Sequence, residues 1–126
     1  MEHCEIEIKT HTKGSLSLYR AKGTLRTTER GIAVSYSHEG EAVLLLMEED
    51  ALTMERESLS MRFERGKDTF ARLKAGGHEG RHPLRTKFYS LMRGEAAHSA
   101  ALKYELGDPA QKFTLSIRVC PGSEER

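Results

Sequence analysis

The chain is short of several residue types that many folds require. Its 126 residues include no tryptophan, three prolines and two cysteines, and aromatic residues make up only 6%. The cysteines, Cys4 and Cys120, stand at opposite ends of the chain, and nothing in the sequence points to an oxidising compartment. Two thiols are too few for a structural zinc site. We therefore predict two reduced thiols, without a disulfide and without a metal.

Long apolar runs are also missing. No stretch approaches the roughly 20 apolar residues that a membrane helix needs, and the opening Met1–Glu5 does not resemble a signal peptide. We expect a cytoplasmic protein that has no membrane partner.

Charge is balanced rather than biased. Lys and Arg number 20 and Asp and Glu 19, which gives a net charge of +1. Bulk attraction to nucleic acid or to an anionic surface is absent, so we expect no nucleic-acid partner. Hydrophobic residues amount to 37% and are spread evenly along the chain, which favours one folded domain over disorder.

The dominant signal is an alternation of apolar and polar residues with a period of two, which is typical of half-buried β-strands. The continuous apolar run 42–47 is too short for a helix between its flanking turn residues, so we interpret it as a strand buried on both faces. The alternating segments lie within 4–9, 32–37, 52–54, 59–64, 102–106 and 113–119.

Glycine and proline interrupt these runs about every 8–12 residues, a spacing typical of antiparallel barrels and sandwiches. No helix is long enough to connect parallel strands. Closing the sheet would remove its exposed edges and pair the first strand with the last. We predict an all-β fold, a single closed antiparallel meander barrel of about 8–10 strands over residues 1–120. Residues 121–126 are expected to form a solvated tail.

The apolar phase of each strand predicts which residues face the barrel interior. A barrel of this size either fills with side chains or keeps room for one ligand. Candidate ligand-binding residues in the lumen are Tyr36, Met61, Phe63 and Tyr104, and no tryptophan is present to cap a closed end. The full inward set is Ile6, Ile8, Ile32, Val34, Tyr36, Leu59, Met61, Phe63, Tyr104, Leu106, Leu115 and Ile117.

Several loose motifs follow one another along the chain, from Gly23-Thr24-Leu25 to Tyr36-Ser37 and then through 52–56, 61–67, 82–86, 102–106 and 115–119. Their order resembles the YwiB-like family of small bacterial calycin barrels. The resemblance covers nearly the whole chain and implies a lipocalin-like barrel from a family without an assigned activity. One motif departs, because His82-Pro83-Leu84-Arg85 stands where that family tends to carry Thr-Pro-Tyr-Gly.

A second resemblance concerns Glu5, Glu7 and Lys9, which share one strand face. This pattern resembles the opening strand of triphosphate-tunnel enzymes, where inward carboxylates hold Mg²⁺ against a triphosphate. Arg56 and Arg62 would complete such an anionic site. The triphosphate-tunnel interpretation would turn Cys4, Ile6 and Ile8 outward, and the sequence lacks the helices that cover such barrels. We therefore favour the alternative, in which Glu5, Glu7 and Lys9 lie on a solvated outer face.

The sequence signals for other kinds of site are weaker. His78 and His82 could share a strand face as two metal ligands, but no third ligand is nearby and flanking glycines favour an exposed loop. No nucleophile motif or phosphate loop occurs, and no cofactor is implied. Three functions stay open: a ligand-binding barrel without enzymatic activity, a phosphohydrolase, and an interaction barrel that dimerises through 42–47.

Overall fold

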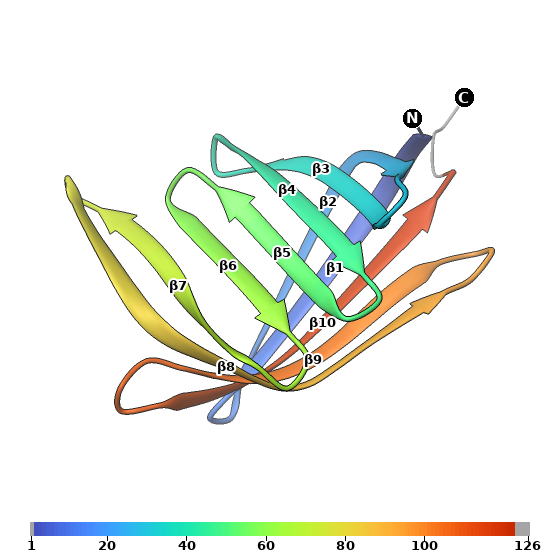
Figure 1. Ribbon diagram of the computed structural model, residues 1–126. Coiled ribbons are helices and arrows are strands. Elements are labelled where there is room, and N and C mark those ends of the chain that lie inside the picture. Colours follow the sequence, from blue (N-terminus) through green and yellow to red (C-terminus); the bar gives the residue numbers. More distant parts are fainter. Residues whose placement is uncertain (1, 123–126) are drawn as a thin grey trace.

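The computed structural model describes residues 2–122 and shows a meander of ten antiparallel strands (Figure 1). Each strand pairs with its neighbours in sequence, and β1 pairs with β10 to close the barrel. The predicted all-β closed barrel of about 8–10 strands is confirmed. The strands are β1 (Glu2–Thr12), β2 (Ser15–Thr27), β3 (Gly31–His38), β4 (Glu41–Glu48), β5 (Ala51–Arg56), β6 (Leu59–Glu64), β7 (Asp68–Ala75), β8 (His78–Arg93), β9 (His98–Leu106) and β10 (Gln111–Pro121).

The closing seam follows from the amphipathic pattern of the two terminal strands. Ile6 lies opposite Val119 and Ile8 opposite Ile117, so the apolar faces of both strands coincide. Cys4 lies opposite Pro121 and Cys120 opposite Glu5, which places the two thiols on different faces of the sheet. Both are unlinked, with Cys4 buried and Cys120 half-buried.

Because consecutive hairpins alternate in direction, the turns sort into two ends. One end, which we call the terminal end, carries the turns at 28–30, 49–50, 65–67 and 94–97 together with both termini (Figure 1). The other, the distal end, carries the turns at 13–14, 39–40, 57–58, 76–77 and 107–110.

The interior is packed with apolar side chains. All twelve residues of the predicted inward set belong to one core: eight are buried, and Ile8, Tyr36, Leu59 and Leu106 are partly buried against it. Burial of one such side chain stabilises the fold by about 1.5–3 kcal/mol. Phe63, Ile6, Leu45 and Leu102 are among the largest that solvent does not reach.

Three strands have no counterpart in the alternation analysis, namely β2, β7 and β8. Leu16 and Leu18 of β2 face outward and are 69% and 49% exposed. β2 pairs with β3 only from Gly23 to Thr27, where a side chain on Gly23 would overlap the Ser35 carbonyl. Residues 15–22 are therefore paired with β1 alone.

Two further expectations need correction. The run 42–47 is a strand, but only Val43, Leu45 and Met47 are buried, and outward Leu44 is 42% exposed. The strand β10 extends through Pro121, one residue beyond the expected boundary, and residues 123–126 of the expected tail lie outside the described residues. Within residues 2–122 no helix is long and apolar enough to cross a membrane.

Candidate functional site

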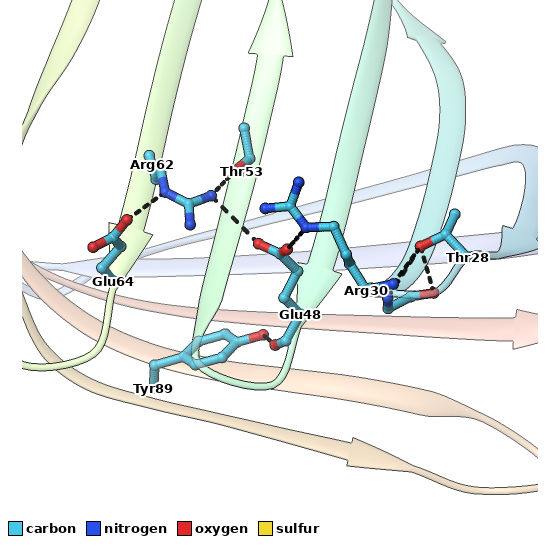
Figure 2. Close-up of polar contacts among 8 residues, drawn as sticks. Thr28, Arg30, Glu48, Thr53, Arg62, Glu64 and Tyr89 are labelled. Atoms are coloured by element: carbon cyan, nitrogen blue, oxygen red, sulfur yellow. Dashed lines mark hydrogen bonds and ion pairs between the residues drawn. The ribbon is translucent and has the colours of Figure 1, made fainter.

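The terminal end of the barrel is sealed by a tyrosine and an arginine. The Tyr89 hydroxyl donates a 2.6 Å hydrogen bond to the Glu48 carbonyl (Figure 2), and burial raises the pKa of Tyr89 to about 12. Arg65 covers the Tyr89 ring at 5.9 Å, donates from Nε to the Tyr89 carbonyl and pairs with Asp50 at 2.7 Å. These residues close the end for which the sequence offers no tryptophan.

Beside this end, the outer face carries a network of charges that neutralise one another. The Glu48 carboxylate lies between Arg30 at 2.8 Å and Arg62 at 3.4 Å, and Arg62 also donates to Glu64 at 2.6 Å and to Thr53 at 2.8 Å (Figure 2). The hydrogen bond from Arg62 lowers the pKa of Glu64. The network ties β4, β5 and β6 to the turn before β3, so we interpret it as structural.

The distal end is polar inside the barrel as well as outside. Arg56 and Glu41 share the parity of inward residues on β5 and β4, and they form an ion pair at 2.7 Å with side chains 16% and 29% exposed. The backbone N–H and hydroxyl of Ser58 donate to the same Glu41 oxygen. Arg56 and Ser58 together lower the pKa of Glu41.

Aromatic side chains border this ion pair. Tyr19 packs edge-on against His38 at 4.3 Å and donates from its hydroxyl to the Ser37 carbonyl at 3.0 Å. Burial, with a smaller contribution from Tyr19, raises the pKa of Tyr36 to about 12, although Arg56 opposes the shift. Within the described chain the Tyr36 hydroxyl has no hydrogen-bond partner. We call Tyr19, Tyr36, His38, Glu41, Arg56 and Ser58 the distal cluster.

A groove of about 460 Å³ adjoins the distal cluster, between the β5–β6 turn and the β7–β8 hairpin. Glu41 and Ser58 belong both to the distal cluster and to the lining of this groove. The groove is also lined by Glu57, Lys74, Ala75, Gly76, Gly77, His78 and Glu79. Next to Ser58, Leu59 lies opposite Leu73 on the inner face, and Leu73 is 36% exposed. Polar and apolar surfaces therefore meet at this end.

The four predicted lumen residues all face inward, but three of them fill the barrel. Met61, Phe63 and Tyr104 are buried in the core, with Phe63 edge-on to Tyr104 at 4.8 Å. Tyr104 also stacks on Phe113 at 5.0 Å. Its hydroxyl has no hydrogen-bond partner among the described residues, and burial raises its pKa to about 12. Only Tyr36 reaches the distal cluster.

The predicted anionic site is not assembled. Glu5, Glu7 and Lys9 lie on the outer face of β1, because Cys4 and Ile6 occupy the interior, and Glu7 pairs with Arg20 at 3.0 Å. Arg62 lies on the outer face of β6, whereas Arg56 points inward. The triphosphate-tunnel interpretation needs inward carboxylates, so that arrangement is not formed.

Two other expectations concern histidines and dimers. His78 and His82 lie in β8 rather than in a loop, and no group of three His, Cys, Asp or Glu among residues 2–122 could hold a metal ion. Outward Leu44 lies between Ser35 and Glu55 in the register, so its apolar surface is interrupted on both sides. A dimer through 42–47 stays a prediction.

Most of the distal cluster was not predicted from the sequence. Tyr19 belongs to a strand that was not predicted, and Glu41 and Ser58 adjoin turns whose residues had no assigned direction. One signal was available: Glu41 has the same parity as Val43 and Leu45, so it had to face inward if the strand began at residue 41.

Together these features define a closed antiparallel β-barrel with a filled interior, one sealed end and one polar end. No family model and no curated protein matches the sequence. The fold is similar to the crystal structure of the YwiB protein from Bacillus subtilis, with a TM-score of 0.77. That match covers 96% of this chain and 91% of YwiB at 17% identity, so it supports a YwiB-like fold and nothing finer.

Proposed function

We propose that the barrel binds a small amphipathic molecule at its distal end and is not an enzyme. The observation that carries the proposal is the groove of about 460 Å³, which shares Glu41 and Ser58 with the distal cluster. On the inner face beside Ser58 lies the paired, partly exposed apolar surface of Leu59 and Leu73. The size of the groove lies within the range of small-molecule sites. Such a site would hold the polar end of a ligand near Glu41 and its apolar end against the leucines.

The charges favour a neutral or cationic polar group over an anionic one. Glu41 already neutralises Arg56, and the groove adds Glu57 and Glu79 against Lys74. Glu79 lies 3.8 Å from Arg72, so Glu57 is the groove carboxylate that has no ion pair with any residue from 2 to 122, and an amine can pair with it. Arg56 uses Nε for Glu41 and one further nitrogen for the His38 carbonyl, which leaves N–H groups for a ligand acceptor.

The protonation states in the distal cluster favour binding over catalysis. An acid–base catalyst works best with a pKa near the working pH. The pKa of Glu41 is lowered and that of Tyr36 is raised to about 12, so neither group exchanges a proton readily near neutrality. This supports a binding role for the distal cluster.

Three probes with one alkyl chain test the proposal: hexylamine, hexanamide and hexanoate, titrated into isotopically labelled protein and followed by amide chemical shifts. We expect shifts around Ser58, Leu73 and Gly77, with hexanoate weakest. Glu57→Gln should weaken hexylamine, while Glu49→Gln at the terminal end should not. Absence of shifts at the distal end, or tightest binding of hexanoate, would contradict the proposal.

A second measurement asks what the protein carries in the cell. Mass spectrometry of the purified protein under non-denaturing conditions should find a co-purified amphipathic molecule, released by denaturation. Leu73→Asn should reduce its occupancy, because the substitution removes apolar surface from a side chain that is already 36% exposed. Occupancy unchanged by Leu73→Asn would place the ligand elsewhere.

A further inference from the structure

The net charge of +1, from which no nucleic-acid partner is expected, hides a segregation of charge around the barrel that leads to a different inference. Strands β8, β9, β10, β1 and β2 are consecutive in the closed sheet. Residues 2–28 and 76–122, which contain them, carry 12 Lys and Arg against 7 Asp and Glu, an excess of 5 positive charges. Residues 29–75 carry 7 against 10, an excess of 3 negative charges. One half of the wall is therefore cationic and the other half anionic.

The two halves also differ in how their cations are used. In the anionic half, Arg30, Arg56, Arg62, Arg65, Lys67 and Arg72 all form ion pairs. In the cationic half, Lys9, Lys103, Lys112 and Arg118 are exposed and form no ion pair with any residue from 2 to 122. Their charge is thus available to a partner.

Two hollows lie along the outer face that these cations share. One, of about 530 Å³, is lined by Glu5, Ile6, Glu7, Arg20, Ala21, Lys22, Arg118 and Cys120. The other, of about 400 Å³, is lined by His11, Lys13, Lys87, Lys103 and Lys112 together with one carboxylate, Glu105, and with uncharged residues. Between them Lys9 lies opposite Ser116. From Arg118 to Lys112 the strand spans roughly 20 Å, so the cations form a line along β10.

An exposed aromatic ring stands beside this line. Phe88 is 46% exposed on the outer face of β8 and lies opposite Lys103, at the point where the β8–β9 register shifts. The neighbouring outward residues of β9 and β10 include Ala101 and Ser116, which are small and leave the surface accessible. An aromatic face beside a row of lysines is the combination that single-stranded nucleic acids bind by stacking and charge.

We propose that a short single-stranded nucleic acid binds along the outer face of β10, from the hollow at Arg118 to the hollow at Lys112, with a base stacked on Phe88. Lys9 and Lys103 contact phosphates. The site lies on the outer face of the wall, apart from the distal cluster, so it is independent of the proposed small-molecule site.

Fluorescence anisotropy with a labelled uridine dodecamer at several salt concentrations tests this proposal. The slope of log affinity against log salt should fall by about 1.4 when two contacts are lost in Lys9→Gln/Lys103→Gln. The matched variant Lys67→Gln/Lys74→Gln removes the same charge from the anionic half and should leave the slope unchanged. Equal losses in both variants, or no salt-dependent binding, would overturn the proposal.

A second comparison distinguishes base stacking on Phe88 from purely electrostatic binding. Phe88→Ala should lower the affinity for the dodecamer roughly five- to hundredfold. Leu44→Ala, which truncates a side chain of similar exposure on β4, should not. If an abasic dodecamer or polyphosphate binds as tightly as the uridine dodecamer, or if anionic vesicles bind and the dodecamer does not, a nucleic acid is the wrong partner.

Discussion

Two buried tyrosines provide a test of how this barrel is held together. Tyr89 and Tyr104 are 1% and 6% exposed, and burial raises the pKa of each to about 12. The Tyr89 hydroxyl donates to the Glu48 carbonyl at 2.6 Å, whereas the Tyr104 hydroxyl has no partner in the described chain. Replacement by phenylalanine removes one hydroxyl in each case and keeps the ring.

The expected effects differ in size. Tyr89→Phe loses a hydrogen bond and deprives the buried Glu48 carbonyl of a donor, which costs about 1–3 kcal/mol. The ring contact with Arg65 at 5.9 Å remains, so no cavity term is added. Tyr104→Phe removes a hydroxyl that has no partner among residues 2–122 and is not one of the buried unpartnered polar atoms, so the stability should change by less than about 0.5 kcal/mol or should increase.

Urea denaturation followed by circular dichroism measures both changes. We expect a lower midpoint with an unchanged slope for Tyr89→Phe and no fall for Tyr104→Phe. In thermal unfolding, each kcal/mol should correspond to roughly 3–5 °C for a chain of this length. A Tyr104→Phe variant at least as unstable as Tyr89→Phe would refute the reasoning, because it would show that the unpartnered hydroxyl contributes as much as the bonded one.

Three shorter predictions concern the closing seam and the terminal end. Ile6→Ala should destabilise by about 2–5 kcal/mol in urea, since Ile6 is 1% exposed. A thiol reagent should label half-buried Cys120 in the native protein and Cys4 only on unfolding, because burial also raises the pKa of Cys4; simultaneous labelling would contradict the assigned faces. Burial and Arg93 lower the pKa of His98, so the folded state binds that proton less tightly than the unfolded chain, and stability should fall as pH drops below about 6.5. His98→Gln should flatten this fall between about pH 7 and pH 5, while the exposed-site control His78→Gln should not.

The closed barrel could be predicted because strands with one face in solvent and one in the core alternate strictly between polar and apolar residues. Ile6 and Val119, 113 positions apart, have the phase that places them opposite each other in a closed meander. Continued to the two thiols, the same phase places Cys4 in the interior and Cys120 on the outer face, in agreement with the register. Parity is a local property, so it can be determined from sequence.

The alternation failed where a strand lacks a clear wet and dry side. In β2 the inward positions include Ser17, Tyr19 and Ala21, while Leu16 and Leu18 face solvent. The apolar residues of the segment 15–22 thus have the opposite phase from Leu25, which lies near the other end of β2. Residues 15–22 pair only with β1, and their inner face meets the polar distal cluster, where Tyr19 contacts His38, so apolar residues are not selected there.

Arg56 and Arg62 show why the candidate site could not be assembled from sequence. Both numbers are even, so on one continuous strand the two side chains would share a face. The turn at residues 57–58 instead places Arg56 opposite Leu59, and this odd register puts even positions inward on β5 and outward on β6. Arg56 therefore joins Glu41 inside the distal end, and Arg62 joins Glu48 and Glu64 outside the terminal end. The chemistry available to each arginine depends on the length of a two-residue turn, which alternation within single strands does not contain.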